Sequence, residues 1–364
     1  MAMRSVMTAG LIWMLAGCPR PVTANLVIAT CPDPKNCTAS NGTGVYTAED
    51  GFAGFGTSQL MITHFINTGS SVMFQGRYLN KFTKNWQMLS APGIVRVGSF
   101  HQEPVNIISV AETSTVPTWT LRNVAGQVRT AAGDDLLQLL LFISFNANDE
   151  AKNFAIDFVD SRVIQASANA PPISVFSMRW RDVANPAQIT PYCLDADHQP
   201  DPVVFQRGID VDPVFGQVMR SPANPEAANF VTMSCYQGAL ATAYGWGYDY
   251  LTNPFYFDAA IQMKRASYCG DAAHYTVANT KILMRDDAGI NHEPINNDPI
   301  NWLEASWSPA GAICVNLGNM RHRGTATRPG FNGFCGQQEL RPCGALVKIR
   351  RSPFLFEGPE HPAP

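Results

Sequence analysis

Residues 154–158 read Phe-Ala-Ile-Asp-Phe and residues 176–181 read Phe-Ser-Met-Arg-Trp-Arg. In both stretches every second residue is large and apolar, and the residues between them are small or polar. Trp119 and Leu121 alternate with polar neighbours in the same way. Since successive side chains of a strand point to opposite faces, this alternation predicts strands with one buried face and one exposed face. It indicates a mainly β protein.

A more continuous apolar run extends from Leu136 to Phe145. It is too short to cross a bilayer, and it suits either a strand buried on both faces or a core helix, of which we favour the strand. The prolines at 171–172 and 186 interrupt the strand pattern, because proline does not fit inside a paired strand. They predict a domain boundary between residues 185 and 186.

One segment has the composition of a helix. Asp258 is a suitable N-cap, the residues after it are mostly good helix formers, and Lys264 and Arg265 complement the dipole at the C-terminal end. We therefore expect a short helix from Asp258 to Ala266. The fold class expected is mainly β, that is α+β with little helix.

The length and composition indicate how many domains to expect and which class of partner the charge does not favour. A chain of 364 residues is long enough for about two domains. Only 15% of the residues are charged, and the formal net charge is −3, so the overall charge gives no reason to bind nucleic acid.

The N-terminus reads as an export signal. Arg4 precedes an apolar stretch from Val6 to Gly17, which has the length of a secretory h-region. The sequence Leu15-Ala16-Gly17-Cys18 resembles the lipobox of bacterial lipoproteins, which implies that Cys18 is lipidated and becomes the mature N-terminus. No Asp follows Cys18, so we expect an anchor in the outer membrane, with the protein periplasmic or surface-exposed. An acylated cysteine carries enough chains for stable anchoring.

The cysteine count fits an exported protein. Nine cysteines become eight once Cys18 is assigned to lipid, and an even number in an exported chain indicates a disulfide framework. We expect local pairs between Cys31 and Cys37 and between Cys335 and Cys343. The remaining four are then expected to pair among themselves, namely Cys193, Cys235, Cys269 and Cys314.

Several ordered blocks in the second half of the chain resemble a known family. The central block is Ala266-Ser267-Tyr268-Cys269-Gly270-Asp271, and it is accompanied by Pro191-Tyr192-Cys193, by Trp246-Gly247-Tyr248, and by a segment from Glu304 to Cys314. Together they resemble the Ala-Asp-Tyr-Cys (ADYC) domain family of secreted or lipid-anchored bacterial proteins, over about residues 186–345. The Asp of the family name is Ser267 here. The resemblance implies no established activity, and the surviving helix and cysteine suggest a structural motif that joins the helix through Cys269 to a neighbouring strand.

Candidate chemistry is sparse. Cys269 with Asp271 and His274 has the residue types of a nucleophilic site, but pairing of Cys269 in a disulfide is favoured. The Asn- and Asp-rich stretch from Asp286 to Asp298 lacks EF-hand spacing, and turn formation explains it as well as calcium does. We expect no metal site, no cofactor and no catalytic residue that the sequence identifies.

The segment Tyr244-Gly245-Trp246-Gly247-Tyr248-Asp249-Tyr250 is rich in aromatic residues. As a strand it would place Tyr244, Trp246, Tyr248 and Tyr250 on one face. Such a face suits stacking on sugar rings or on a partner, and packing against the predicted helix explains it too, which is the alternative that we favour.

These observations give one layout and two functional hypotheses. We expect a signal peptide (1–17), a tether with a local Cys loop (18–50), an N-terminal β-rich domain (51–185), a disulfide-stabilised β-rich ADYC-like domain with one short helix (186–350) and a tail (351–364). The expected function is a lipid-anchored cell-envelope module without catalysis, bound to the membrane through its anchor and with a polysaccharide or an envelope protein as partner. The alternative is an extracytoplasmic hydrolase acting on polysaccharide or peptide.

Overall fold

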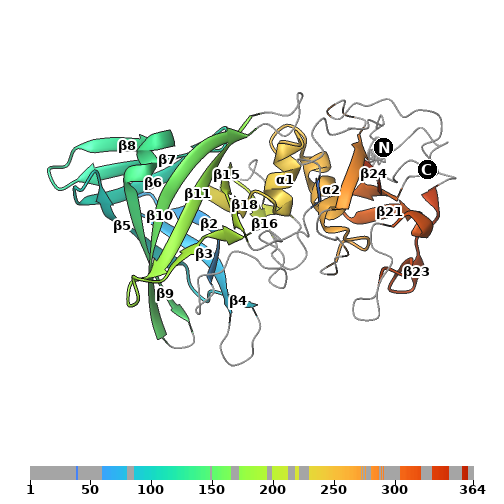
Figure 1. The fold of residues 1–364 in the computed structure, drawn as a ribbon, viewed down its shortest axis with the longest axis horizontal. Helices are drawn as coiled ribbons and strands as arrows, with labels where there is room; N and C mark the ends of the chain where they lie inside the picture. Colours follow the sequence, from blue (N-terminus) through green and yellow to red (C-terminus); the bar gives the residue numbers. More distant parts are fainter. Residues whose placement is uncertain are drawn as a thin grey trace, which may run out of the picture.

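The structure is a computed structural model, shown in Figure 1. It describes residues 38–39, 60–79, 86–147, 150–164, 172–194, 199–211, 218–220, 229–271, 273, 275, 280–286, 288, 290, 304–320, 330–343 and 355–359.

Eight antiparallel strands close into a barrel. Their order around the barrel is β10-β9-β5-β3-β2-β18-β15-β11, and β11 pairs back onto β10 to close the ring. Closure leaves none of these strands as a free edge. The eight strands are β2 (Leu60–Asn67), β3 (Val72–Leu79), β5 (Gly93–Phe100), β9 (Leu139–Ala147), β10 (Glu150–Ile164), β11 (Ile173–Asp182), β15 (Val203–Arg207) and β18 (Phe230–Cys235), with β4 (Trp86–Met88) added to β3 and β12 (Ile189–Pro191) added to β11.

The barrel interior is filled by the alternating side chains that predicted the strands. Ile156 of β10 lies opposite Trp180 of β11, and Phe158 lies opposite Met178. All four are buried, and the rings of Phe154 and Trp180 meet edge to face with centroids 5.3 Å apart. The mainly β prediction is therefore confirmed, and the interior is a packed core.

A hairpin closes one end of the barrel. It consists of β6 (Val105–Thr113) and β7 (Val116–Asn123), with β8 (Val128–Ala132) at its side. β6 contacts β2, β3, β5, β15 and β18. The Asn67 side chain donates to the Val110 carbonyl (2.7 Å) and accepts from the Val110 N–H (2.8 Å), and Trp119 is fully buried with its ring 5.0 Å from that of Phe65.

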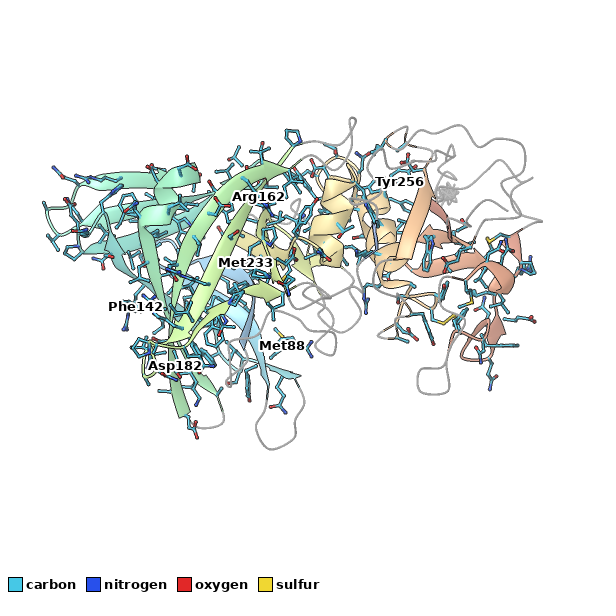
Figure 2. All side chains as sticks on the ribbon, viewed as in Figure 1. Met88, Phe142, Arg162, Asp182, Met233 and Tyr256 are labelled. Carbon is cyan, nitrogen blue, oxygen red and sulfur yellow. A yellow bond between two sulfur atoms is a disulfide. The ribbon has the colours of Figure 1, made fainter. Side chains whose placement is uncertain are left out.

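The apolar run from Leu136 to Phe145 is mostly strand, as expected. A 3-10 helix, η2 (Gly133–Gln138), holds its first three residues, and β9 begins at Leu139. Burial alternates along β9 from Leu139 to Phe145. The inward side chains of the strand are buried, and the outward ones, such as Phe142 (Figure 2), are partly exposed. The strand is therefore not fully buried on both faces, contrary to what was expected.

Two helices connect the barrel to a smaller sheet (Figure 1). α1 (Ala239–Gly245) packs on the outside of the barrel, where Ala241 joins a small cluster with Val204 and Val175. α2 (Pro254–Arg265) packs between α1 and the C-terminal sheet, and its residues from Ala259 to Arg265 are all buried.

The predicted helix exists but begins earlier than expected. Pro254 occupies its first turn, where the missing N–H and the fixed φ of proline cost nothing, and Asn253 is the N-cap. Asp258 therefore lies inside the helix and does not cap it. α1 was not expected from the sequence.

The C-terminal sheet has the order β1-β19-β24-β20-β21 and thus joins segments from both ends of the chain. Its strands are β1 (Thr38–Ala39), β19 (Thr280–Arg285), β24 (Leu355–Pro359), β20 (Ala305–Ser308) and β21 (Gly311–Val315), followed by the 3-10 helix η4 (Leu317–Asn319). Three short strand pairs complete the fold: β13 (Cys193–Leu194) with β14 (Pro200–Asp201), β16 (Asp210–Val211) with β17 (Val218–Arg220), and β22 (Phe334–Cys335) with β23 (Gln338–Glu339).

The barrel draws strands from both sides of the expected boundary at residues 185 and 186. β15 and β18 follow that position and pair with β11 and β2, which precede it. In the described part of the chain, no helix has the length and apolarity needed to cross a membrane.

Three disulfides are formed by the described cysteines: Cys193–Cys235, Cys269–Cys335 and Cys314–Cys343. The first lies within the set of four cysteines expected to pair among themselves. Cys269 and Cys314 pair outside that set, so the expectation is wrong for these two. The expected local pair between Cys335 and Cys343 is wrong, because Cys343 lies against β21, where its N–H donates to Asn316 (2.9 Å) and the Val315 N–H donates to the Arg341 carbonyl (3.0 Å). Cys18, Cys31 and Cys37 lie outside the described residues. The disulfides indicate an extracytoplasmic protein.

Candidate functional site

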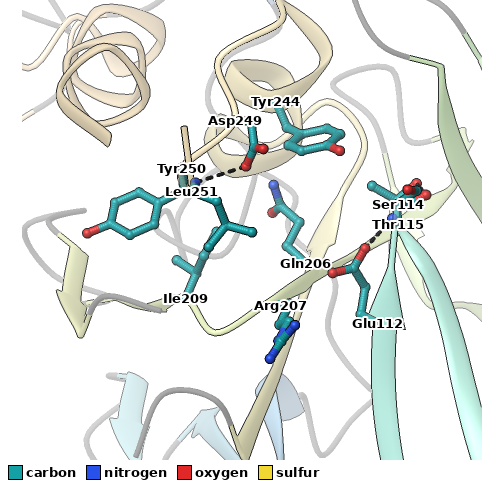
Figure 3. Close-up of a pocket in the computed structure, with 10 residues that line it drawn as sticks. All are labelled: Glu112, Ser114, Thr115, Gln206, Arg207, Ile209, Tyr244, Asp249, Tyr250 and Leu251. Carbon is teal, nitrogen blue, oxygen red and sulfur yellow. Dashed lines mark hydrogen bonds between the residues drawn. The ribbon is translucent and has the colours of Figure 1, made fainter. Parts of the chain in front are cut away.

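A cavity of about 170 Å³ lies where the tip of the β6–β7 hairpin meets the end of β15 and the loop after α1 (Figure 3). We call it the hairpin-tip pocket. Polar and apolar side chains both line it: Glu112, Ser114, Thr115, Gln206, Arg207, Ile209, Tyr244, Asp249, Tyr250 and Leu251.

The hairpin tip that forms one wall has a strained backbone. Ser114 and Thr115 both have positive φ, 52° and 64°, which is the type I′ turn that normally takes Asn-Gly. Thr115 is β-branched, so this conformation is unfavourable for it. Two bonds hold the turn in place: the Thr115 N–H donates to the Glu112 carboxylate, and the Ser174 N–H donates to Thr115 Oγ1 at 2.5 Å. Strain that the surrounding structure maintains is typical of functional sites.

Glu112 is mostly buried at this wall, and burial raises the pKa of its carboxyl. The N–H groups of Thr115 and Arg207 and the positive charge of Arg207 lower the pKa, and the negative charge of Asp249 raises it. The net direction is upward. The protein thus keeps a carboxyl in a place where the charged form is poorly compensated.

Tyr244 is close enough to both acids to feel their charges. Its pKa is raised to about 12, first by burial and then by the charges of Asp249 and Glu112. Figure 3 shows the Tyr244 ring beside Asp249, with Glu112 on the opposite wall. The three groups therefore interact electrostatically across one cavity.

The other walls are fixed by hydrogen bonds and by a ring contact. Gln206 is buried, donates to the Leu240 carbonyl (3.4 Å) and accepts from Ser234 (3.3 Å). Asp249 accepts from the Leu251 N–H (2.9 Å), and the ring of Tyr250 packs edge to face on Phe257. The site offers carboxylate and hydroxyl groups on preformed walls.

The block Ala266–Gly270 ends α2 and packs against the C-terminal sheet. Ala266 adopts the left-handed conformation, and the N–H of Ser267 reaches back to the Gln262 carbonyl (2.9 Å), which forms a Schellman C-cap. Ser267, at the position of the family's Asp, is buried, and its hydroxyl donates to the Asp271 carbonyl (2.9 Å).

The next residues of the block are anchored by side chains. Tyr268 stacks on Phe331 and Trp307 with centroids 4.6 and 5.1 Å away, and its hydroxyl donates to the buried carboxylate of Glu304. Cys269 forms the disulfide to Cys335 in β22. Backbones meet at Gly270 and Gly311, where a Cβ on either glycine would lie less than 3 Å from backbone atoms of the other segment.

The model of the ADYC domain family matches residues 133–321, just over half of the chain. The chain belongs to the ADYC domain family. Searches among curated proteins and among solved structures found no match. The match begins at η2 and spans β9, β10, β11, β15 and β18, so the ADYC region includes much of the barrel as well as the anchored block.

The ADYC block, residues 266–271, contains two of the three residues named above as candidates for nucleophilic chemistry, Cys269 and Asp271. Cys269 is held in a disulfide and has no free thiol for nucleophilic attack. His274 lies outside the described residues. Within the described segments, no group of three or more His, Cys, Asp or Glu side chains is arranged to hold a metal ion.

The segment from Tyr244 to Tyr250 is not a strand. Tyr244 belongs to the last turn of α1, and the chain then turns through Trp246 and Gly247. Trp246, Tyr248 and Tyr250 are largely buried, and the Tyr248 hydroxyl donates to Asp286 (2.8 Å), which is itself fully buried. The four residues thus form no exposed stacking face. Only Tyr244 and Tyr250 reach the hairpin-tip pocket.

Sequence reasoning did not find Glu112, Arg207 or Asp249. They come from β6, β15 and the loop after α1, and no short motif joins them. The local signal that existed was the Glu-Thr-Ser-Thr sequence at 112–115, a polar turn between two alternating segments.

The anchoring of the ADYC block is testable with Tyr268→Phe. The change leaves the ring stack intact and removes the hydroxyl that bonds the buried Glu304, so we expect a loss of about 1–3 kcal/mol in the free energy of unfolding. Tyr275→Phe is the control, because Tyr275 lies in the same aromatic cluster with its side chain partly exposed. Urea unfolding of both variants gives the comparison, and equal stability of the two would contradict the assigned role.

Proposed function

We propose that this ADYC protein is a lipid-anchored cell-envelope module that binds one sugar residue of a polysaccharide in the hairpin-tip pocket, without converting it. The observation that carries the proposal is the meeting of Glu112, Tyr244 and Asp249 around one cavity beside the barrel. Hydroxyl groups of a sugar donate well to carboxylates and exchange hydrogen bonds with a tyrosine.

The size and the walls of the pocket support a single ring. Its volume of about 170 Å³ is below the roughly 300–1,000 Å³ of sites for drug-sized ligands. Tyr250, Ile209 and Leu251 provide apolar surface for the C–H face of a sugar, opposite the polar groups.

The proposed localisation in the cell envelope rests on the N-terminal sequence and on the disulfides. The lipobox-like Leu15–Cys18 supports an acylated Cys18 and an outer-membrane anchor, and the disulfides agree with an oxidising compartment. Mass spectrometry of the protein from its native envelope tests this part of the proposal. A diacylglyceryl group on Cys18 is the expected result, and an unmodified Cys18 on a chain that retains residues 1–17 would overturn it.

Binding is tested with the protein purified from its envelope in detergent and a panel of envelope polysaccharides and their component sugars. We expect at least one sugar to bind, and Asp249→Ala to weaken that binding by about tenfold or more, since it removes a charged acceptor. Glu150→Ala is the matched control, because Glu150 is an exposed acid paired with Lys152 at the start of β10. If the wild type binds no member of the panel, the proposed ligand class is wrong.

One observation favours hydrolysis as a second candidate. Burial, and to a smaller extent the charge of Asp249, raises the pKa of the Glu112 carboxyl, and a raised carboxyl pKa is one feature of the general acid in glycoside hydrolysis. Incubation of polysaccharides and peptides with the wild type and with Glu112→Gln separates the two functions. Release of products by the wild type alone would establish a hydrolase in place of the binding module.

A further inference from the structure

We propose that the hairpin-tip pocket selects a sugar that carries a free primary ammonium group. The inference rests on the proposed sugar-binding function and names the class of sugar. It is carried by the balance of charges around the cavity and by the surroundings of Glu112.

The charge balance of the pocket is negative. Of the ten lining residues, Glu112 and Asp249 are acids and Arg207 is the basic one. Arg207 is an exposed residue at the end of β15, and it reaches the Glu112 carboxylate through its backbone N–H. A neutral ligand would leave two carboxylates facing one cavity, whereas an ammonium group compensates this charge.

The hydrogen-bonding groups suit the same ligand. An ammonium group donates three hydrogen bonds and accepts none. Glu112 and Asp249 are acceptors on two walls, and the Tyr244 ring lies beside Asp249. Charge-assisted bonds of this kind are roughly twice as strong as neutral ones, and a tyrosine face adds cation–π attraction.

The charge of the buried Glu112 carboxylate is not fully offset by the groups around it. The N–H groups of Thr115 and Arg207 and the charge of Arg207 do not offset desolvation and the charge of Asp249, so its pKa stays raised. A bound cation would stabilise the carboxylate and lower that pKa. Binding of an ammonium ligand is therefore coupled to loss of the Glu112 proton.

Three sugars that differ at one position test the inference: glucosamine, N-acetylglucosamine and glucose. Isothermal titration of the full-length protein in detergent near pH 7 is expected to show glucosamine binding about tenfold tighter than the other two, since the amide and the hydroxyl carry no charge. Glu112→Gln and Asp249→Asn are each expected to lower glucosamine affinity about tenfold more than glucose affinity, so that the preference for glucosamine is lost.

A control variant and a pH profile show whether the charge of Glu112, and not only the shape of the pocket, determines the affinity for glucosamine. Glu150→Gln removes an exposed acid elsewhere and is expected to change nothing. The charged and titratable groups facing Glu112 are Arg207, Asp249 and Tyr244. Glucosamine affinity is expected to rise as the pH increases above the ordinary glutamate pKa of 4.5 and Glu112 ionises, and Glu112→Gln is expected to flatten that rise.

Each outcome distinguishes the two proposals. If glucose or N-acetylglucosamine binds as tightly as glucosamine, the ammonium selectivity is wrong and sugar binding stands. If none of the three binds but another neutral sugar of the panel does, the same conclusion follows. If no sugar binds, the proposed function falls, and the inference falls with it.

Discussion

Gly311→Ala is expected to destabilise the protein by more than about 4 kcal/mol, or to prevent its folding. A Cβ at this position would lie 2.6 Å from the Gly270 nitrogen and 2.6 Å from the Tyr268 carbonyl oxygen. These are backbone atoms of the ADYC block, which is tied to β22 by the Cys269–Cys335 disulfide and to β21 by a bond from the Ala312 N–H to the Tyr268 carbonyl (2.8 Å). The segment therefore cannot move aside without losing the Tyr268 stack.

Two further glycine substitutions separate crowding from backbone strain. Gly69 has a positive φ of 89° but open space around it, so Gly69→Ala carries the conformational cost alone, about 1–2 kcal/mol. Gly318 has open space and no positive φ, so Gly318→Ala is expected to be nearly neutral. Urea unfolding of the three variants is expected to show a much larger loss in the free energy of unfolding for Gly311→Ala than for Gly69→Ala. A loss no larger than that of Gly69→Ala would show that the ADYC block is not packed as described.

Asp258→Asn is expected to stabilise the protein at pH 8 by about 2–4 kcal/mol and to change little at pH 4. Asp258 lies inside α2, largely buried, and one of its carboxyl oxygens has no hydrogen-bond partner among the described residues. Burial raises its pKa from 3.8 to about 7. The folded state therefore holds a proton that the unfolded state has already lost between those two values.

The direction of the pH effect follows from this difference. The stability contributed by protonated Asp258 is fully present below about pH 4 and is lost as the pH rises through about 7. The melting temperature of the wild type is expected to fall between about pH 5 and about pH 8, and that of Asp258→Asn to fall less. Asp135→Asn, at an exposed position of η2, serves as the control. Parallel pH profiles for the wild type and Asp258→Asn would contradict the assignment.

The strands were predictable from sequence because the barrel buries one face of each strand. Phe154, Ile156 and Phe158 point inward, their neighbours point outward, and the chain records this as alternation. α2 was predictable for a similar local reason. Its start was misplaced because Asp258 is a good N-cap by type, whereas Pro254 and Asn253 had already begun the helix.

Other features depended on contacts that a linear pattern does not carry. Tyr248 and Tyr250 gave a strand-like pattern, but Tyr248 is buried against Asp286, which follows β19, and Tyr250 packs on Phe257 of α2. The hairpin-tip pocket is lined by residues of β6, β15 and the loop after α1, which are far apart in the sequence and meet only in the folded protein. Thr115 could not be predicted as a site residue, since neither its burial nor its positive φ follows from its residue type.

The pairing of the last four described cysteines has a consequence for biogenesis. Cys269 joins Cys335 and Cys314 joins Cys343, so the two links are interleaved along the chain. If thiols were oxidised in the order in which they emerge from a translocation channel, Cys269 would meet Cys314 before either native partner was available. Native pairing therefore requires oxidation to wait until residue 343 has emerged, or a thiol–disulfide exchange that rearranges the early bond. A cell that exports this protein efficiently needs a disulfide isomerase activity or a delayed oxidant in the compartment where the protein folds.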